Sequence, residues 1–416
     1  GCGYSHVAAT SLFAHGKTGG APYDSFPVKL AMGTYGEGHE YDPALAWRYF
    51  NYVSDAVGAV DSAAAATAMS VGVKTYDAAI GVDLDHRPLR HAIEVAEDRG
   101  LATGVVTSVE ISHATPAAFV AHHRSRDSYD AIARQMICES RLEVIMGCGH
   151  PLFDANGEPI ARPRQFRYVG GPKTWEDLRD GRGTGADADG DGTPDDWTVV
   201  FSREEFLSLA HGPTPKRVLG VAKKLTTLQQ ERRGDPNAAP FAVPYNGDVP
   251  TLAEMTEGAL NILDNDPDGF FLMVEGGAVD WASHDNQTGR MIEEKTEFDK
   301  AVQTVLAWIQ KESSWRETLL VVTSDHDSGY LTGPGSGPSA KGEPKWTAPV
   351  GRGQGQVPDV EWHSDGHTNS LVPFYAQGRN AHLFDRAAQK RDPVRGRYLH
   401  NTDLGKILHT VLTSRW

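Results

Sequence analysis

Apolar runs that alternate with helix-forming segments constrain the fold of this chain more than any other feature. Three short runs have the length and composition of buried strands, and they span residues 101–106, 270–274 and 319–322. The segments 88–99 and 293–310 show helical periodicity. Strands that alternate with helices are typical of a mostly parallel sheet covered by helices. The sequence therefore predicts an α/β fold with a large, mostly parallel central sheet and helices on both faces.

The size and charge of the chain narrow the class of protein further. Its 416 residues are many for one hydrophobic core but suit a large open α/β sheet, so we expect a single domain over residues 1–416. The formal net charge of −15 argues against a nucleic-acid partner, and no segment is apolar enough to span a membrane. Cys2, Cys138 and Cys148 are too few for a disulfide framework. Cys138 and Cys148 either pair in an oxidising compartment or remain buried thiols.

Residues of the kinds that bind metal ions follow two of the expected strands. Glu275 comes directly after the second run, and Asp325 and His326 come shortly after the third. Asp280 and His284 have i,i+4 spacing, so that in a helical turn they share one face. A carboxylate and an imidazole on one face suit a zinc ion. Each residue alone also fits a plainer role, because a histidine is often a hydrogen-bonded structural residue and an aspartate often a cap.

The dipeptide Asp61-Ser62 marks the expected start of a helix. It precedes four alanines at positions 63–66, and alanine has the highest helix propensity while aspartate is a favoured N-cap. A serine in the first turn lies where free backbone N–H groups and the helix dipole favour an anion. Its hydroxyl is then well placed to attack or receive a phosphoryl group. An ordinary capped, alanine-rich helix is the alternative for this segment taken alone.

Seven segments together form a constellation that is more specific than any one of them. They are Asp61-Ser62-Ala63, His113 to His122, Ser125-Arg126, Val274-Glu275-Gly276, Asp280 to His284, Thr323 to His326, and His367-Thr368. In this order and at roughly this spacing they resemble the alkaline phosphatase family along most of the chain. The resemblance implies the fold of that family and a metal-dependent phosphate monoester hydrolase.

The resemblance also implies a role for each matching residue. Ser62 would be the nucleophile that becomes phosphorylated, and Arg126 would bind two phosphate oxygens. The first zinc ion would be held by Asp280, His284 and His367. The second zinc ion would be held by Asp325, His326 and the Ser62 oxygen. A magnesium ion would be bound by Glu275 and Thr115, with His113 in its surroundings.

Two positions near the implied site depart from the best-known bacterial pattern. His113 stands where those enzymes often have aspartate, and Trp281 where they often have lysine. An imidazole is a softer ligand than a carboxylate-bound water, so it favours zinc at the third site or weakens magnesium there. Asp61 and Trp281 would line the substrate pocket, and the missing lysine charge predicts a weaker hold on product phosphate. Plain packing at the pocket rim is the alternative for Trp281.

Two long segments look inserted into the fold, one at about 153–245 and the other at about 331–361. The second is rich in glycine and proline and is expected to form a lid or an interface element. The first contains an acidic loop at 187–197 whose carboxylates resemble a calcium site. The four candidate ligands are Asp187, Asp189, Asp191 and Asp195. A solvated acidic turn is the alternative, although clustered carboxylates repel one another without a cation.

The first residues of the chain suggest that one family element is missing. Family members begin with a buried strand ending in Gly-Asp-Gly-x-Gly, whose Asp bridges the second zinc and the magnesium. An ungapped match places Gly1 directly after that Asp, so we expect the strand before residue 1 to be absent. The alternative places Cys2 at the Asp position, where a thiolate suits zinc but not magnesium.

The resemblance thus implies a periplasmic or secreted enzyme that hydrolyses phosphate monoesters through a phosphoserine, with two zinc ions and one magnesium ion. The pattern of the acidic loop adds the expectation of a calcium ion. Small phosphate monoesters and inorganic phosphate are the expected partners, and a homodimer the expected assembly. A phosphodiesterase or a sulfatase of the same superfamily is the nearest alternative. A catalytically silent metal-binding or calcium-binding relative is the alternative from another class.

Overall fold

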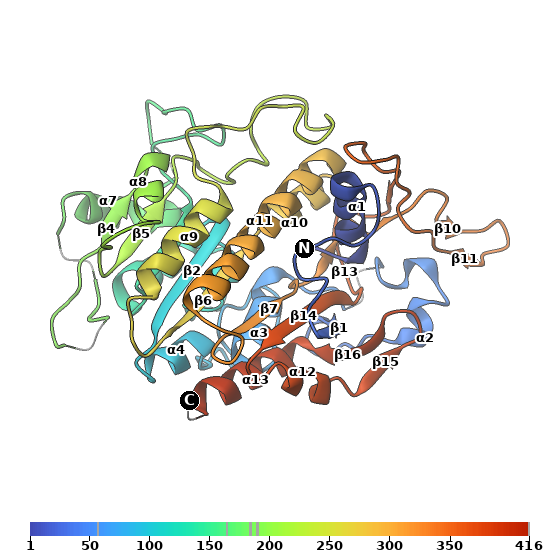
Figure 1. Ribbon diagram of the computed structural model, residues 1–416, viewed down its shortest axis with the longest axis horizontal. Coiled ribbons are helices and arrows are strands. Elements are labelled where there is room, and N and C mark those ends of the chain that lie inside the picture. Colours follow the sequence, from blue (N-terminus) through green and yellow to red (C-terminus); the bar gives the residue numbers. More distant parts are fainter. Residues whose placement is uncertain (56–57, 164, 183–184, 189–190, 415–416) are drawn as a thin grey trace.

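The computed structural model describes residues 1–55, 58–163, 165–182, 185–188 and 191–414. Two five-stranded sheets form its centre, and their edge strands β6 and β7 lie next to each other (Figure 1). The first sheet consists, in spatial order, of β4 (Thr198–Val200), β5 (Val218–Val221), β3 (Val144–Cys148), β2 (Ala102–Glu110) and β6 (Phe270–Glu275). The second consists of β15 (Lys390–Asp392), β16 (Gly396–His400), β1 (Val28–Gly33), β14 (Val372–Gly378) and β7 (Leu319–Val322).

The first sheet is parallel throughout, as the alternation of strands and helices predicts. β2 pairs in parallel with both β3 and β6, and β5 pairs in parallel with β3 and β4. Every residue of β2 is buried, because helices cover both faces of the sheet. Val105 and Val106 accordingly point into two different apolar clusters, one on each face.

The second sheet is mixed. β1 runs parallel to β16 but antiparallel to β14, and β14 is antiparallel to β7. The α/β class and the helix-covered parallel sheet are therefore confirmed, with the strands divided between a parallel and a mixed sheet. The division was not visible in the sequence, because the direction of a strand depends on the connection that leads to it.

A cavity of about 690 Å³ lies between the two sheets, where β6 and β7 face each other. Each of these strands is the last of its sheet in the described part of the chain, and their residues are mostly only half-buried. The cavity is lined by apolar side chains of both strands, and Gly1 and Cys2 lie among its lining residues. The expectation of a further strand beside Gly1 stays a prediction.

Helices cover the sheets on both sides (Figure 1). On one side lie α9 (Leu252–Leu263) and α11 (Thr288–Glu312), and on the other α3 (Ser62–Val71), α4 (Ala92–Glu97) and α13 (Asn401–Thr413). The helix expected at 293–310 is part of α11. The helix expected at 88–99 is shorter in the structure, since Pro88 pairs with Val82 in an isolated bridge and α4 begins only after its N-cap, His91.

Most of the remaining elements are short, and α1 is the longest of them. The helices are α1 (Tyr4–His15), α2 (Pro43–Ala46), α5 (Ala114–Ala117), α6 (Tyr129–Arg134), α7 (Gly171–Arg179), α8 (Arg203–Ser208), α10 (Ala278–His284) and α12 (His382–Ala387). The 3₁₀ helices span Phe50–Tyr52 and Phe166–Val169, and a π-helical turn spans Gln135–Glu139. The two-residue strands are β8 (Asp327–Ser328), β9 (Leu331–Thr332), β10 (Gly337–Pro338), β11 (Pro344–Lys345), β12 (Glu361–Trp362) and β13 (His367–Thr368).

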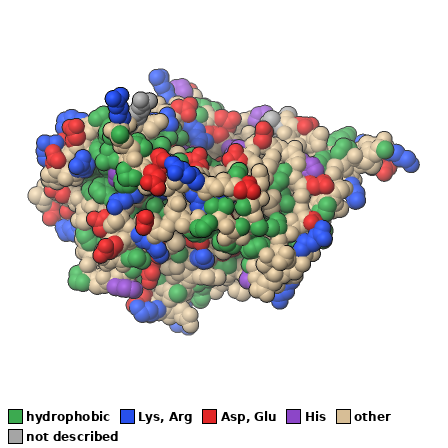
Figure 2. All heavy atoms as spheres, turned by 90° about the horizontal axis from the view of Figure 1, so that it is seen from above, with side chains coloured by type: hydrophobic (Ala, Val, Ile, Leu, Met, Phe, Trp, Pro, Cys, Tyr) green, Lys and Arg blue, Asp and Glu red, His purple; other side chains and the backbone are tan. Residues whose placement is uncertain are grey.

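The two segments that look inserted differ in kind. Residues 153–245 supply β4 and β5, so this segment also extends the parallel sheet. Residues 331–361 contain the β10–β11 hairpin, which projects from the body of the protein (Figure 1). Acidic and basic side chains are interspersed on the face seen in Figure 2. None of the described helices combines the length and apolar character needed to cross a bilayer.

Candidate active site

The carboxyl ends of β6 and β7 bring the expected metal-binding residues together. Glu275 ends β6, and after two glycines the chain enters α10, which carries Asp280 and His284. β7 ends at Val322, three residues before Asp325. Open α/β sheets commonly bind their ligands at this edge. The short pair of β8 and β13 then places His367 opposite Ser328 and so beside the same edge.

Asp280, His284 and His367 form one compact group. Nε2 of His284 lies 3.3 Å from Oδ2 of Asp280, and Nε2 of His367 lies 3.7 Å from Oδ1 of Asp280. One ligand atom of each residue lies within 4.8 Å of the other two. The i,i+4 spacing on α10 aligns the first two, whereas the β8–β13 pair supplies the third. Two imidazoles and a carboxylate are a zinc-type ligand set.

Asp325, His326 and Ser62 form a second group next to the first. Ser62 Oγ lies 2.9 Å from Nε2 of His326, and the same nitrogen lies 3.0 Å from Oδ2 of Asp325. The His326 ring stacks on that of His367 with 3.6 Å between centroids and an angle of 27°. Burial opposes ionisation of Asp325, but the His326 ring and the amino group of Gly1 hold its pKa well below the usual value. The stacked rings of His326 and His367 therefore join this second group to the first.

Ser62 is the first residue of α3. Asp61 is the N-cap, and its Oδ1 accepts hydrogen bonds from the backbone N–H groups of Ala64 and Ala78, both at 3.0 Å. The capped start directs the free N–H groups of the first turn toward the serine side of the site. Ser62 is only 5 % exposed. Its hydroxyl thus lies in a buried, anion-favouring position beside imidazole and carboxylate groups.

Arg126 is held in place by two neighbours. Its Nη1 donates to Oδ2 of Asp61 at 3.0 Å, and its Nη2 lies 3.1 Å from Nε2 of His113. Burial and the adjacent Arg126 charge lower the pKa of His113 to about 3, so the imidazole is neutral. A neutral imidazole that accepts from Arg126 through Nε2 carries its proton on Nδ1. Nδ1 of His113 is buried and makes no hydrogen bond with any described residue, so in this tautomer it does not offer a lone pair to a metal.

Glu275 and Thr115 lie on the side of the site formed by β2, β6 and α5. Oε2 of Glu275 accepts a hydrogen bond from Thr107 Oγ1. Burial raises the pKa of Glu275, while the hydroxyls of Thr107 and Thr115 oppose the rise. Thr115 is 7 % exposed. These oxygen donors are of the kind that magnesium prefers.

The amino group of Gly1 lies inside this cluster of acidic groups. Its nitrogen is 2.8 Å from Oδ1 of Asp325. Burial disfavours the charged amine, but the carboxylates of Asp325 and Asp280 raise its pKa to about 10. The carboxylates of Asp325 and Asp280 lie in one buried place, and such a group favours a positive charge, as a site for divalent cations requires. The side chain of Cys2 packs instead on an apolar cluster that includes Val279.

One residue of the site was missed by the sequence analysis. Ser328 Oγ donates a hydrogen bond to Oδ1 of Asp280. It thereby orients the carboxylate whose two oxygens face His284 and His367. A signal for it was present, because Ser328 lies two positions after His326. Residues two apart in an extended segment lie on the same face.

The sequence model of the alkaline phosphatase family matches residues 39–350 of this chain. The chain is a member of the alkaline phosphatase family. It is 34 % identical over 285 residues to alkaline phosphatase of Escherichia coli K12, covering 64 % of this chain and 57 % of that protein. It is 36 % identical over 284 residues to the repressible alkaline phosphatase of Saccharomyces cerevisiae, covering 65 % and 46 %. The chain spans about half the length of the curated relatives it matches.

Solved alkaline phosphatases share the fold. The cold-active enzyme of the psychrophile Shewanella sp. superposes with a TM-score of 0.67 at 23 % identity, over 100 % of this chain and 98 % of that one. The enzyme of the Antarctic bacterium TAB5 gives a TM-score of 0.65 at 23 % identity, over 100 % and 96 %. These likenesses support the α/β architecture of the family for the whole chain.

Trp281 lies on α10, directly after Asp280 of the zinc-type group. Its ring is 5.7 Å from that of His113, with an angle of 58° between them. The rings of His113 and Trp281 are therefore in contact. His113 also contacts Arg126, so its ring lies between Trp281 and the guanidinium contact.

The carboxylates of the acidic loop accept hydrogen bonds from backbone N–H groups of the same loop. Oδ2 of Asp187 accepts from the N–H of Gly192 at 2.9 Å, Oδ1 of Asp191 from Thr193 at 2.8 Å, and Oδ2 of Asp195 from Ala188 at 3.1 Å. Asp189 lies outside the described residues. Neither of the two metal-ligand groups found among the described residues is in this loop. Calcium binding stays a prediction.

Cys2, Cys138 and Cys148 are free thiols in the structure.

Proposed function

We propose that this protein hydrolyses small phosphate monoesters and releases inorganic phosphate, with a phosphoserine formed on Ser62. The observation that carries the proposal is the position of Ser62 Oγ, at the start of α3 and 2.9 Å from Nε2 of His326. Membership of the alkaline phosphatase family supports the same reaction.

The reaction assigned to Ser62 has two displacements. The serine oxygen attacks the phosphorus atom, the bond to the ester oxygen breaks, and the alcohol leaves with a proton. A water molecule then attacks the phosphoserine, which releases phosphate and regenerates the hydroxyl. Serine is a poor nucleophile at its ordinary pKa and needs an adjacent base or a positive charge. His326 Nε2 at 2.9 Å is one group that can orient the hydroxyl, and the start of α3 favours the phosphate charge.

Three metal ions fit the residues present. Two zinc ions would be held by Asp280, His284 and His367 and by Asp325, His326 and Ser62, and a magnesium ion by Glu275 and Thr115. When bound, zinc supplies the positive charge that lowers the pKa of a nearby hydroxyl and balances charge on the leaving oxygen. The fit rests on the 4.8 Å grouping of the first three residues and on the buried carboxylates that favour a cation. A solved variant of the TAB5 enzyme has Mg bound in its M3 site.

Arg126 is proposed to bind the phosphate oxygens. A guanidinium group has five N–H donors, and its planar fork matches phosphate geometry. Asp61 and His113 each engage one of the two terminal nitrogens, which leaves further N–H groups for a ligand. These two contacts therefore position the fork without using all its donors.

The family resemblance also supports a homodimer and a periplasmic or secreted location. The projecting β10–β11 hairpin is a candidate interface element, since it lies away from the sheets (Figure 1). A calcium ion in the loop at 187–197 is a further part of the proposal, because carboxylates spaced this closely repel one another unless a cation balances them.

Hydrolysis of three related substrates tests the function. The protein, supplied with zinc and magnesium, should cleave p-nitrophenyl phosphate much faster than bis(p-nitrophenyl) phosphate or p-nitrophenyl sulfate. Ser62→Ala should lose this activity, whereas Ser70→Ala at the other end of α3 should keep it. Faster cleavage of the diester or the sulfate would instead identify a phosphodiesterase or a sulfatase. No turnover of any of them by the metal-loaded protein would favour a silent metal-binding relative.

A further inference from the structure

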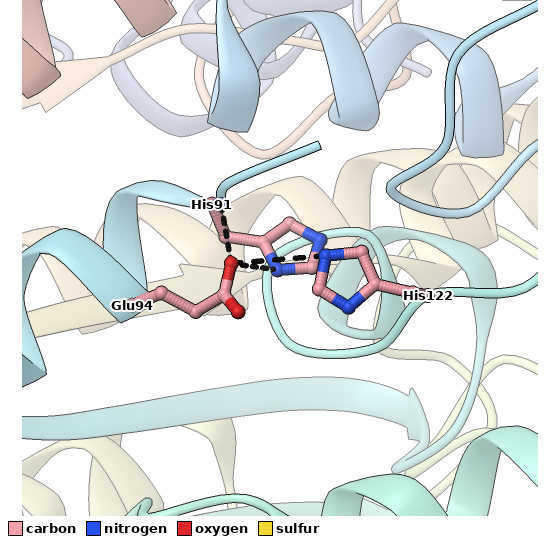
Figure 3. Close-up of side chains that lie close together, drawn as sticks. All are labelled: His91, Glu94 and His122. Atoms are coloured by element: carbon pink, nitrogen blue, oxygen red, sulfur yellow. Dashed lines mark hydrogen bonds and ion pairs between the residues drawn. The ribbon is translucent and has the colours of Figure 1, made fainter. Parts of the chain in front are cut away.

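Three side chains outside the active site converge at the start of α4 (Figure 3). They are His91, Glu94 and His122, which we call the His91 cluster. His91 is the N-cap of α4 and Glu94 lies in its first turn, whereas His122 comes from the segment after α5. One ligand atom of each lies within 4.8 Å of the other two. We propose that the His91 cluster binds a divalent transition-metal ion such as Zn²⁺.

The spacing of the donor atoms suits a tetrahedral ion. Nδ1 of His91 lies 3.3 Å from Oε2 of Glu94, and Nε2 of His122 lies 3.7 Å from the same oxygen. In a tetrahedron with zinc bonds of about 2.0–2.2 Å, ligand atoms are roughly 3.3–3.6 Å apart. Small movements of these side chains therefore suffice to place two imidazoles and a carboxylate around one zinc ion.

His91 provides a second, independent observation. Its side chain is fully buried, and neither ring nitrogen has a well-aligned hydrogen bond to a described residue, although Nδ1 faces Oε2 of Glu94 at 3.3 Å. Buried polar atoms nearly always have a well-aligned partner, so a buried imidazole that lacks one and faces a carboxylate leaves a position for a bound ion. Burial lowers the pKa of His91, which keeps the ring neutral and able to bind a metal. Burial opposes ionisation of Glu94, but its contacts with His91 lower its pKa to about 2.

A purely hydrogen-bonded cluster is the competing explanation. Nε2 of His122 lies 2.8 Å from the carbonyl oxygen of Leu89, and the backbone N–H of His91 donates to Oε2 of Glu94 at 2.7 Å. If Nε2 of His122 carries a proton for Leu89, it can bind a metal only after that proton moves to Nδ1. A hydrogen-bonded cluster does not explain why the rings of His91 and His122 stack with their centroids 4.2 Å apart.

A metal ion here would join α4 to the segment that leads to Arg126. That segment is already tied to residues 78–80, since His123 and Ile80 exchange backbone hydrogen bonds of 2.8 and 2.9 Å and Arg126 N–H donates to Ala78 at 2.8 Å. The side chains of Glu94 and His122 are 39 % and 21 % exposed, so an ion and a fourth, water ligand can reach the cluster. The expected role is structural, because an ion that binds only the folded state stabilises it.

Zinc stoichiometry of the full chain tests the proposal. Glu94→Gln is the most informative variant, because glutamine at this position of a helix preserves the capping hydrogen bond but is a poor zinc ligand. After chelation and reloading with Zn²⁺ alone, elemental analysis should find one zinc ion fewer in Glu94→Gln than in the unchanged protein. The affinity of the lost site should fall roughly 100-fold or more, since even partners outside the ligand shell contribute 10–100-fold. His382→Gln, an exposed histidine on α12, is the matched control and should keep every ion.

Thermal unfolding provides the second measurement. Zn²⁺ should raise the Tm of the unchanged protein more than that of Glu94→Gln or of His122→Asn, the variant to use if Glu94→Gln does not fold. Equal stoichiometry and equal Tm shifts in all of these proteins would overturn the proposal. Both variants leave the active-site residues intact, so p-nitrophenyl phosphate hydrolysis should stay within a few-fold. Failure here is thereby distinguished from failure of the proposed function.

Discussion

Ser62 and His326 are 264 positions apart in the sequence, yet Ser62 Oγ lies 2.9 Å from Nε2 of His326. The first begins a helix, and the second follows the end of a strand in the mixed sheet. The same imidazole nitrogen lies 3.0 Å from Asp325, and the ring stacks on His367. One side chain therefore connects the candidate nucleophile to both groups of candidate zinc ligands.

Ser62→Ala should abolish formation of a phosphoenzyme. The change removes the only hydroxyl within hydrogen-bonding distance of His326 Nε2 in the described part of the chain, and kcat for p-nitrophenyl phosphate should fall by several orders of magnitude. Acid quenching with radiolabelled phosphate should label the unchanged protein on Ser62 alone. Label retained by the variant on another residue would disprove the assignment.

His367→Ala should remove one zinc ion from the active site. His367 is one of three ligands grouped within 4.8 Å, and two ligands hold zinc poorly. Elemental analysis of the purified variant should show the loss together with low activity. His363→Ala is the control, since Nε2 of His363 lies 2.7 Å from Thr332 Oγ1 and outside that group. Equal loss in both variants would point to general unfolding and against the ligand assignment.

Arg126→Ala should raise KM for phosphate monoesters and weaken inhibition by inorganic phosphate. Hydrogen bonds to charged groups contribute roughly 1.5–3 kcal/mol, so each effect should be about 10- to 100-fold. Arg124→Ala removes an exposed arginine two residues away and should leave both constants nearly unchanged. Steady-state kinetics with phosphate as competitor measure the difference, and an Arg126→Ala variant with unchanged constants would refute a phosphate-binding role.

Glu294→Gln should stabilise the protein at alkaline pH. Burial, with the nearby carboxylates of Glu297 and Glu293, raises the pKa of Glu294 from 4.5 to about 8. The folded state then holds a proton that the unfolded state releases above pH 4.5, so the stability from this group is complete below pH 4.5 and is lost as pH rises to about 8. Glutamine stays neutral, so the variant should match the unchanged protein near pH 5 and exceed it near pH 9.

Urea unfolding at the two pH values measures this effect. Glu257→Gln, on the exposed side of the neighbouring helix α9, removes the same charge and is the control. It should show no pH-dependent gain. A Glu294→Gln variant that is equally or less stable than the unchanged protein at pH 9 would show that Glu294 is not held protonated by its surroundings.

Local features of the fold were predictable because they depend on near neighbours in the chain. The run at 319–322 is β7, and the run at 270–274 is β6 with one more residue. The Asp61-Ser62 dipeptide begins α3 with the expected N-cap. The parallel pairing of β2 with β6 agrees with the mostly parallel sheet that the alternation with helices predicts. In each case periodicity or a capping preference acts over a few residues.

The candidate site was predictable only as a set of residues. The motifs named Asp280, His284 and His367, but the pairing of β8 with β13 brings the third beside the first. The two contacts that hold Arg126, to Asp61 and His113, join residues 65 and 13 positions apart and leave no local signal. Ser328 was overlooked because its importance comes from the hydrogen bond to Asp280.

By itself, the amino-acid sequence determined the class of fold, the three strands β2, β6 and β7, the start of α3, and the kinds of side chain available for chemistry. Only the tertiary structure decided that the strands form a parallel and a mixed sheet separated by a cavity at β6 and β7. It alone brought His91 against His122. The physical reason is that hydrophobic periodicity specifies which face of an element is buried, whereas long-range packing selects the partner that covers it.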